Sequence, residues 1–599
     1  MKLSEIEIKN FRKLQNVTIS LGDATFLIGA NNAGKTSTLE AINLLLSAGK
    51  LTNSHRSKYI DANGQEVSCQ EDVIISGLFT NVQPSILNER GFNADRLLCT
   101  TDEQGNVTYS FRYRIRLSAD GKMHYEMQLH PLDFKTEYQE CTTWQQFVDL
   151  GVPASSFEGK ELSKKLKKTD IEELKSLCPS LFTINAEQQW FENPGGIASN
   201  VASKLPRFLH IEASVLSEEM DASKTGTLHS LLSFMFEDVR SKSENYQKAV
   251  EALEALSREM DPNVETGAFG QLMNDLNKVV DHVFPNASIQ IDTSLTQAES
   301  LKPIFGVSMT SNISTDISHQ GTGLIRSAVF ALLRFYKERT ESDLSRDERG
   351  LIIGFEEPEL FLHPKAAENM RNVIYDLASQ NSQIVATTHS PYMIDLSVKP
   401  KQVLNSYSCI EHEFTQITAF NLSQAFMQIH ENDKMRVKMI QKIDDYVSRV
   451  FFARKVILVE GDTEDIVFKK TISVMPEEVR KEISATCQVI KATGKATMVS
   501  FIKYLKALNV DLFVVHDEDS HIPGAEVMNE PILQSLGGDD SKRLMLHDCI
   551  EDQLGYPAPS SDKPYRAYMV VNRWTRWSDV PSNWKEKVKI IFSDFADRL

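Results

Sequence analysis

The chain has 599 residues, which is too long for one hydrophobic core, so we expect two or three domains. Its 41% hydrophobic and 25% charged content is typical of a globular protein, and the absence of a run of about eighteen apolar residues argues against a membrane span. The net charge of −17 argues against a surface that coats nucleic acid along its whole length, but it leaves room for a local basic groove.

The N-terminus and the cysteines bear on location and redox state. Met1 opens directly into a strand pattern, so we expect no signal peptide. The seven cysteines have no paired spacing, which suits a reducing cytoplasm and offers no zinc site. A cytoplasmic protein without a membrane partner is therefore expected.

The first motif along the chain is a phosphate-binding loop. Residues 3–21 alternate apolar and polar side chains around Asn10-Phe11-Arg12, which predicts a hairpin, and residues 25–28 predict a buried strand. The segment 29–36 then fits G-x-x-x-x-G-K-[ST] ahead of an amphipathic helix, so its N–H groups are expected to wrap phosphates of ATP. Lys35 would reach the terminal phosphates, and the Thr36 hydroxyl would ligate magnesium. The predicted nucleotide-binding residues of this loop are Gly29, Asn31, Asn32, Gly34, Lys35, Thr36 and Ser37.

A helical segment follows a mixed region that gives no secure elements. Residues 208–284 carry apolar residues at three-to-four spacing, as in KAVEALEALSREM. Such a stripe needs a partner, which is either a second copy of the chain or the parent domain. Both alternatives remain open at this stage.

Further ATPase-like motifs follow this segment. Ser318, Gly321 and Gly323 open a predicted helix whose N-terminus would present N–H groups to an anion. Residues 350–357 predict a buried strand that ends in two acids, the Walker B arrangement. Glu356 takes the position of the acid that holds magnesium through a water molecule, and Glu357 takes the place of the base that activates the attacking water. His389 ends another predicted strand, where it could sense the terminal phosphate.

The most informative stretch is KVILVEGDTEDIVF, from residue 455 to 468. It predicts a buried strand that ends in an acidic turn at Glu460, followed by a helix that contains Glu464. A second buried strand, at 512–515, delivers Asp517 and Asp519, which would face the same way in an extended segment. Sites of open α/β sheets lie at these strand ends. We expect the four carboxylates to converge with no basic residue among them, and such a cluster needs Mg²⁺ or Mn²⁺ to neutralise it.

These motifs carry two resemblances. The I-K-N-F-R hairpin before G-x-N-N-A-G-K-T resembles ABC-type ATPases of the SMC and Rad-fifty class, in which Arg12 would either contact nucleotide or remain a solvated surface residue. The signature segment of that class resembles residues 318–326, although Ile325 replaces the common glutamine before Arg326. The E-G-x-x-E and D-x-D strand ends resemble the Toprim domain of topoisomerases, primases and certain nucleases.

The combination resembles the OLD (overcoming lysogenisation defect) family of nucleases. It implies an α/β fold in which an ABC-type ATPase domain with a helical insertion is followed by a Rossmann-like Toprim domain. The expected boundaries are residues 1–205 and 291–400 for the two ATPase parts, 206–290 for an insertion that forms a dimer contact, 401–449 for a linker and 450–599 for the Toprim domain. The resemblance also implies Glu551 as a fifth metal ligand and Lys563 as a lysine that stabilises charge on the phosphodiester.

The function implied is a DNA nuclease that uses two Mg²⁺ or Mn²⁺ ions and is controlled by ATP binding or hydrolysis. Members of the family act in anti-phage defence, as homodimers or larger oligomers, alone, with a helicase-like partner or as a retron effector beside a reverse transcriptase and its nucleic acid. The alternatives are an ABC or SMC-like DNA-repair ATPase and a nucleotide-gated scaffold, each with an inactive Toprim domain.

Overall fold

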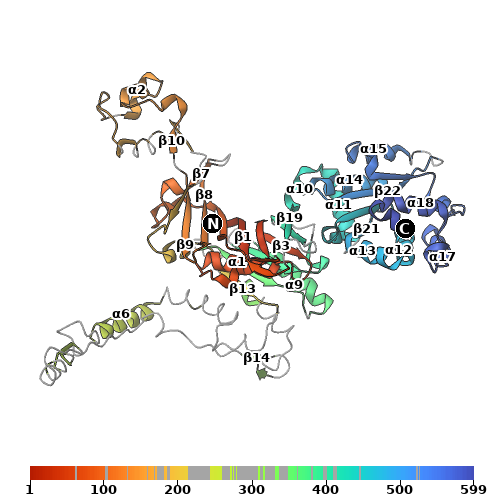
Figure 1. Ribbon diagram of the computed structural model, residues 1–599, viewed down its shortest axis with the longest axis horizontal. Coiled ribbons are helices and arrows are strands. Elements are labelled where there is room, and N and C mark those ends of the chain that lie inside the picture. The colour runs from red at the N-terminus through yellow and green to blue at the C-terminus, as the bar shows by residue number, and fades with distance from the viewer. Residues whose placement is uncertain are drawn as a thin grey trace. The chain divides into compact units, whose positions relative to one another are not determined.

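A computed structural model shows two compact units (Figure 1), one made of residues 1–210 and 347–599 and the other of residues 211–346. The structure describes residues 1–213 and 349–599 except 61–63, 102–104, 131, 158, 168, 172–173, 175–177, 179–180, 185–188, 361, 379–381, 396–400, 409–413, 444–446, 521–523 and 525. Between 214 and 348 it describes 236, 243–259, 270–272, 274–275, 278, 308–310, 314–316 and 331–335. The predicted signature segment 318–326 lies outside the described residues, as does most of the predicted helical insertion.

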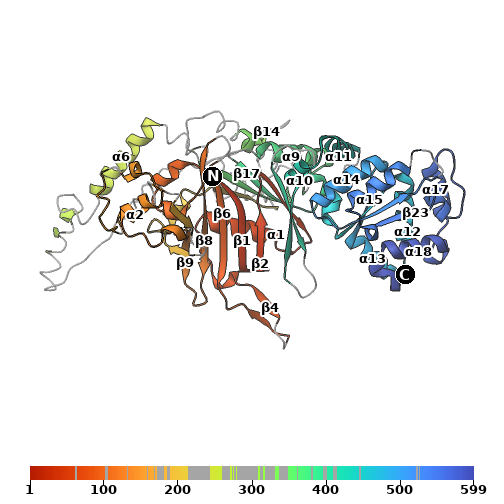
Figure 2. The same ribbon diagram turned by 90° about the horizontal axis from the view of Figure 1, so that it is seen from above.

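The N-terminal part of the chain forms an antiparallel sheet in which the opening hairpin pairs with later strands (Figure 2). The strand order is β12-β9-β8-β6-β1-β2, with β7 paired to β8. The strands are β1 (Lys2–Phe11), β2 (Leu14–Ser20), β6 (Val73–Val82), β7 (Leu98–Thr101), β8 (Val107–Leu117), β9 (Met123–Leu129) and β12 (Gln189–Glu192). Alternate side chains such as Ile6, Ile8 and Ile19 are fully buried, which confirms the period-two pattern of the predicted hairpin.

A second, mainly parallel sheet carries the nucleotide motifs. Its order is β13-β16-β17-β3-β18-β19, so the strand before the phosphate-binding loop, β3, is separated from the Walker B strand, β16, by β17. The elements are β3 (Ala24–Gly29), β13 (Arg207–Ile211), β16 (Leu351–Glu356), β17 (Ser382–Thr388), β18 (Gln402–Ser408), β19 (Gln416–Asn421), α1 (Lys35–Leu46) and α9 (Pro364–Leu377). Every residue of β17 is buried, as expected of a central parallel strand.

The prediction of a linker at 401–449 is wrong. Strand β18 pairs in parallel with β3, from Gln402 opposite Ala24 to Tyr407 opposite Gly29, and β19 pairs with β18. The helices α10 (Leu422–Gln428) and α11 (Glu431–Ile443) follow. Polar side chains made the segment resemble a linker, but the buried amide of Asn405 exchanges hydrogen bonds with the Ser20 backbone, which pairs its polar atoms between the two sheets.

The C-terminal part is a four-stranded sheet in the order β21-β20-β22-β23, with all pairings parallel. Its strands are β20 (Lys455–Val459), β21 (Cys487–Lys491), β22 (Leu512–Asp517) and β23 (Arg543–Leu546). Its helices are α12 (Asp462–Val474), α13 (Glu477–Thr486), α14 (Lys495–Ala507), α15 (Asn529–Ser535), α16 (Ile550–Gln553), α17 (Lys563–Val571) and α18 (Ser582–Ile591). The central pair, β20 and β22, comprises the two strands that the sequence predicted to carry the acidic residues.

Further helices and strands lie among the described residues. They are β4 (Lys58–Ile60), β5 (Glu66–Ser68), β10 (Leu132–Phe134), β11 (Phe182–Ile184), β14 (Ser308–Thr310), β15 (Ser314–Asp316), α2 (Trp144–Asp149), α4 (Ala198–Ala202) and α6 (Glu244–Glu259). Helix α6 lies within the segment whose apolar spacing predicted helices. A search of the described residues found no helix with the length and apolarity needed to cross a membrane.

Candidate functional site

The phosphate-binding loop has the backbone that its glycines predicted. Gly29 and Gly34 have φ values of 135° and 102°, in the region that favours glycine, and a Cβ on Gly34 would lie 2.7 Å from Leu14 Cδ2. Helix α1 begins directly after Gly34, and its first turn contains the exposed Thr36 and the half-buried Ser37. Asn31 and Asn32 are exposed in the loop itself. A triphosphate fits this arrangement, since the first N–H groups of a helix have no partner within the helix.

Lys35 is folded back onto its own loop. Its Nζ donates to the carbonyl oxygens of Gly29 at 3.0 Å and Ala30 at 2.8 Å. Burial lowers the pKa of this lysine, and the negative charge of Glu357 opposes that shift. The ammonium group therefore lies within electrostatic reach of the Walker B glutamate, as expected of a group that neutralises phosphate charge.

The Walker B residues and His389 lie together. Glu357 has an unusual φ of 41° and is held there because its N–H donates to the backbone oxygen of Thr387 at 3.0 Å. His389 Nε2 lies 3.6 Å from Glu357 Oε1, and burial followed by the nearby Lys35 lowers the pKa of the imidazole. The structure thus brings the predicted base and the predicted phosphate sensor to one place beside the lysine.

Two residues that sequence reasoning missed contact this group. His210, in β13, has its Nε2 3.4 Å from Oε1 of Glu356. Glu359 accepts a 2.5 Å hydrogen bond from Thr388 Oγ1, and burial raises the pKa of its carboxyl. Glu359 follows the Walker B acids in the dipeptide Pro358-Glu359, and nothing in the sequence around His210 indicated a site.

Arg12 is engaged within the protein. Its guanidinium forms an ion pair with Glu40 of α1, at 2.5 Å from Nη1 to Oε2. The side chain is 41% exposed, so this pair lies at the surface. The structure therefore gives Arg12 a partner on the helix that follows the phosphate-binding loop.

The second site lies at the carboxyl ends of β20 and β22. Val459 pairs with Val515 in the parallel register, so Glu460 and Asp517 leave neighbouring strands at the same edge of the sheet. Glu464 lies in the first turn of α12, where its Oε2 accepts the Gly461 N–H at 2.8 Å. Glu551 comes from α16 and is 1% exposed. We call Glu460, Glu464, Asp517, Asp519 and Glu551 the carboxylate cluster.

Asp519 reaches the cluster by a different route from the one predicted. It has a φ of 55°, so the segment is not extended, and its N–H donates to the Asp548 carbonyl oxygen at 3.1 Å. The expectation of alternating strand positions is therefore wrong beyond Asp517, where β22 ends. The left-handed turn nevertheless leaves the Asp519 carboxylate close enough to act on Glu460 and Asp517.

The carboxylates of the cluster repel one another in a buried place. Burial raises the pKa of Asp517 to about 9, and the charges of Glu464, Glu460, Asp519 and Glu551 add to that shift in this order. Burial likewise raises the pKa of Glu460 to about 7, and it raises the pKa of Glu464. Asp517 thus lies within short electrostatic range of the other four carboxylates.

Several oxygen atoms of the cluster have no protein partner. Among the described residues, the buried atoms Glu460 Oε2, Asp517 Oδ1 and Glu551 Oε1 accept no hydrogen bond. Buried polar atoms are normally paired, so these oxygens point to a missing ligand. Carboxylate oxygens in this number fit a hard divalent cation such as Mg²⁺ or Mn²⁺ better than zinc.

The expectation that no basic residue lies among the carboxylates is wrong. Lys495, at the start of α14, is 7% exposed, and its Nζ lies 2.7 Å from Asp519 Oδ2. The same Nζ donates to Asn529 Oδ1 at 3.0 Å, and its charge lowers the pKa of Glu460 against the effect of burial. This ammonium offsets part of the negative charge because it is held inside the site by the turn at Gly494.

Lys563 lies near enough to the cluster to act on one of its carboxylates. It is the first residue of α17, half-buried, and its charge lowers the pKa of Glu464 against the effect of burial. The structure thus places two lysines near the carboxylates, of which only Lys563 was predicted.

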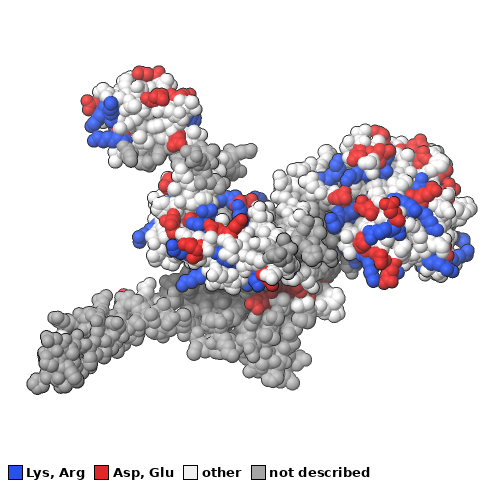
Figure 3. Space-filling view, in the orientation of Figure 1, with Lys and Arg blue, Asp and Glu red and all other residues white. Residues whose placement is uncertain are grey.

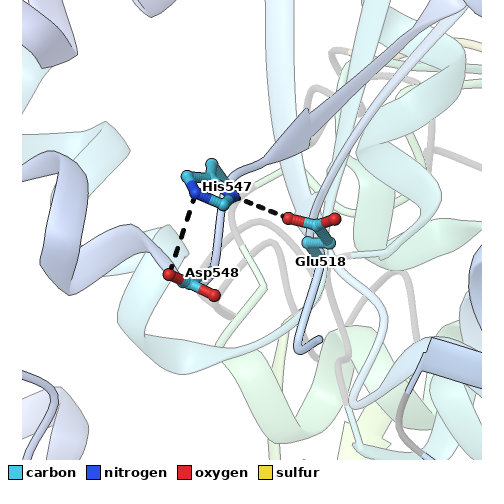
Figure 4. A group of neighbouring side chains, drawn as sticks. All are labelled: Glu518, His547 and Asp548. Carbon is cyan, nitrogen blue, oxygen red and sulfur yellow. Dashed lines mark hydrogen bonds and ion pairs between the residues drawn. The ribbon is translucent and has the colours of Figure 1, made fainter. Parts of the chain in front are cut away.

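Glu518, between the two aspartates, does not join the cluster. It accepts a 2.8 Å hydrogen bond from Nδ1 of His547, whose Nε2 lies 4.0 Å from Asp548 Oδ2. Figure 4 shows the imidazole between the two carboxylates. The hydrogen bond to Glu518 raises the pKa of His547, which is 77% exposed. This group is a surface ion pair beside the buried site.

Comparison with known proteins agrees with this arrangement of two sites. Residues 1–394 match the family model described as an AAA ATPase domain, and residues 451–519 match the TOPRIM domain of overcoming lysogenization defect protein-like proteins. This chain belongs to the AAA ATPase domain family and carries an OLD-like TOPRIM domain. The region matched by the second model begins just before β20 and ends at Asp519, so it contains four of the five carboxylates of the cluster.

Two curated relatives match most of this chain, and a third matches part of it, all at low identity. It is 21% identical to the Old nuclease of Escherichia phage P2 over 87% of this chain and 77% of that one. It is 21% identical to the OLD nuclease of Thermus scotoductus over 94% of both chains. The endonuclease GajA of Bacillus cereus is 25% identical over 31% of this chain and 29% of its own.

Proposed function

We propose that this protein is a DNA nuclease that depends on divalent cations and is controlled by its ATPase domain. The observation that carries the proposal is the carboxylate cluster, because three buried oxygens in it have no protein partner and burial with mutual repulsion raises the pKa values of Glu460 and Asp517. The names of the relatives, Old nuclease and endonuclease GajA, support the reaction. An inactive TOPRIM domain would gain nothing from keeping such a cluster buried.

The residues of the cluster divide the work by position. Glu460, Asp517 and Glu551 would hold two divalent ions through their unpartnered oxygens, with Glu464 and Asp519 beside them. When bound, Mg²⁺ or Mn²⁺ supplies Lewis acidity that activates water and neutralises the scissile phosphate. Lys563 would stabilise negative charge on the phosphodiester, and Lys495 would orient Asp519 through its ion pair.

The ATPase domain would act as the control element. Lys35 would bind the terminal phosphates of ATP, Thr36 and Glu356 would bind its magnesium, and Glu357 would activate the attacking water while His389 senses the terminal phosphate. The arrangement of Lys35, Glu357 and His389 supports these roles. A homodimer that joins two such domains, and a defence role against phage in which DNA is cut, complete the proposal.

The test is cleavage of plasmid and phage DNA by the purified chain with Mg²⁺ or Mn²⁺, with and without ATP. Asp517→Ala should abolish cutting while ATP hydrolysis persists, and Glu357→Gln should slow hydrolysis by about 10²-fold or more while the purified protein still binds ATP. Lys542→Gln, which changes an exposed lysine paired with Asp511, is the matched control and should cut at the normal rate. Undiminished cutting by Asp517→Ala would remove the cluster from the reaction and leave a nucleotide-driven ATPase or scaffold.

A further inference from the structure

The outer face of α17 combines basic and aromatic side chains beside the carboxylate cluster. The stretch from Lys563 to Trp577, KPYRAYMVVNRWTRW, contains four basic residues and no acidic residue, within a chain of net charge −17. Figure 3 shows Lys and Arg side chains at the edge of the TOPRIM domain where α17 lies in Figure 1. Composition of this kind is typical of surfaces that bind the backbone and bases of nucleic acid.

The helix has one side in the core and one side in solvent. Ala567 and Val571 are buried and belong to the core that includes Val467 and Phe468 of α12. On the opposite side, Tyr565 and Tyr568 are 60% and 48% exposed, although burial of aromatic rings is normally favourable. Two exposed aromatic rings three residues apart lie on the same helical face.

The basic residues on this face are available to a ligand. Among the described residues, the side chains of Lys563, Arg566 and Arg573 make no ion pair and no hydrogen bond, whereas Lys481 and Lys542 of the same domain are paired with acids. Arg566 and Arg573 are exposed, seven positions apart, on one side of the helix and its C-terminal extension. Unpaired guanidinium groups in a row match phosphate groups in charge and geometry.

The position of the helix connects this surface to the reaction. Helix α17 packs on α12, the helix that carries Glu464, and Lys563 at its start acts on that same carboxylate. A strand whose phosphate lies at the carboxylate cluster would therefore continue along α17. The negative phosphates of such a strand would meet the positive charge of Arg566 and Arg573 there.

We propose that the outer face of α17 holds the unpaired DNA strand next to the scissile phosphate, with Arg566 and Arg573 on its phosphates and Tyr565 and Tyr568 stacked on its bases. This inference rests on the proposed nuclease function, because it says which surface of the nuclease contacts the DNA substrate. Phosphate contacts supply affinity, whereas ring stacking requires bases that are not already paired. DNA that is single-stranded beside the cut is the substrate that this surface selects.

The test measures binding of the full chain to a short fluorescent oligonucleotide, single-stranded or annealed, in EDTA so that no cutting occurs. Arg566→Gln/Arg573→Gln should weaken single-strand binding roughly tenfold and reduce the slope of log affinity against log salt by about 1.4. Tyr565→Ala/Tyr568→Ala should weaken single-strand binding by roughly tenfold and duplex binding by less. Lys481→Gln/Lys542→Gln, which removes two paired lysines from the same domain, should leave both affinities unchanged.

Each outcome decides one statement. Normal binding by both α17 variants overturns the docking surface. Equal losses for duplex and single strand in Tyr565→Ala/Tyr568→Ala overturn the choice of an unpaired strand. Thermal stabilisation by Mn²⁺ should be the same in the α17 variants as in the parent protein, which shows that the domain is folded and the cluster intact. If the parent protein binds DNA through α17 but cuts no DNA with Mn²⁺, the nuclease proposal fails while the docking surface stands.

Discussion

Replacement of Asp517 by asparagine should stabilise the folded protein in the absence of metal. The carboxyl is 7% exposed, and burial together with its neighbours raises its pKa to about 9 from an ordinary value of about 4. Between these two values the folded protein retains a proton that the unfolded chain has lost. The free energy of unfolding therefore falls as the pH rises, by about 1.4 kcal/mol per pH unit for this one group.

The carboxamide that replaces the carboxyl in Asp517→Asn does not titrate, so the variant lacks this contribution. The free energy of unfolding of Asp517→Asn, relative to the parent protein, should rise by up to about 4 kcal/mol between pH 5 and pH 8. Urea denaturation in EDTA, followed by tryptophan fluorescence, measures the difference, because Trp574 and Trp584 are buried in the TOPRIM core. Glu477→Gln, which removes a surface carboxylate paired with Lys481, is the control and should show no such trend. Parallel pH curves for Asp517→Asn and the parent protein would refute the idea that burial, together with the neighbouring carboxylates, raises the pKa of Asp517.

Three further predictions concern the neighbours of Asp517 and the ATPase site. Lys495→Met should lower the free energy of unfolding by about 3 kcal/mol or more in EDTA, because Asp519 loses a buried partner. Titration calorimetry should find that this variant binds Mn²⁺ more tightly, because the lysine ammonium no longer competes with the cation. Mn²⁺ affinity should fall as the pH falls from 8 to 6, because the pKa of Glu460, raised to about 7, leaves its carboxyl increasingly protonated. The expected fall is up to about tenfold per pH unit for each proton displaced. An affinity that titration calorimetry finds independent of pH would contradict this. Glu357→Gln should slow ATP hydrolysis by about 10²-fold or more with little change in nucleotide affinity, and a phosphate-release assay that finds normal turnover would exclude it as the base.

The strongest local patterns predicted the elements that carry both sites. Four consecutive apolar residues before Glu460 favour a buried strand in this context, and the spacing of Gly29, Gly34 and Lys35 specifies both a turn and a helix start. Family comparison extends this agreement to the order of the two domains. Motifs made of adjacent residues, such as the phosphate-binding loop, can therefore be recognised from the sequence alone.

What the sequence could not predict depends on tertiary contacts. Asn405 is polar and therefore looked like a linker residue. Its burial is stabilised by hydrogen bonds to Ser20, which lies 385 positions away, so no local pattern could indicate it. The dipeptide Gly494-Lys495 is typical of a turn, but nothing local indicated that the lysine side chain points at Asp519. Likewise, His210 meets Glu356 only because β13 and β16 are neighbours in the sheet.

The measurement that tests the central claim most directly is a titration of the nucleotide-free chain with Mn²⁺, which counts the ions bound to the parent protein and to Asp517→Asn. The parent protein should bind two ions that Asp517→Asn and Glu460→Gln bind much more weakly, with protons released on binding near pH 7. Equal Mn²⁺ binding by the parent protein and both variants would contradict the assignment of the carboxylate cluster as the metal site.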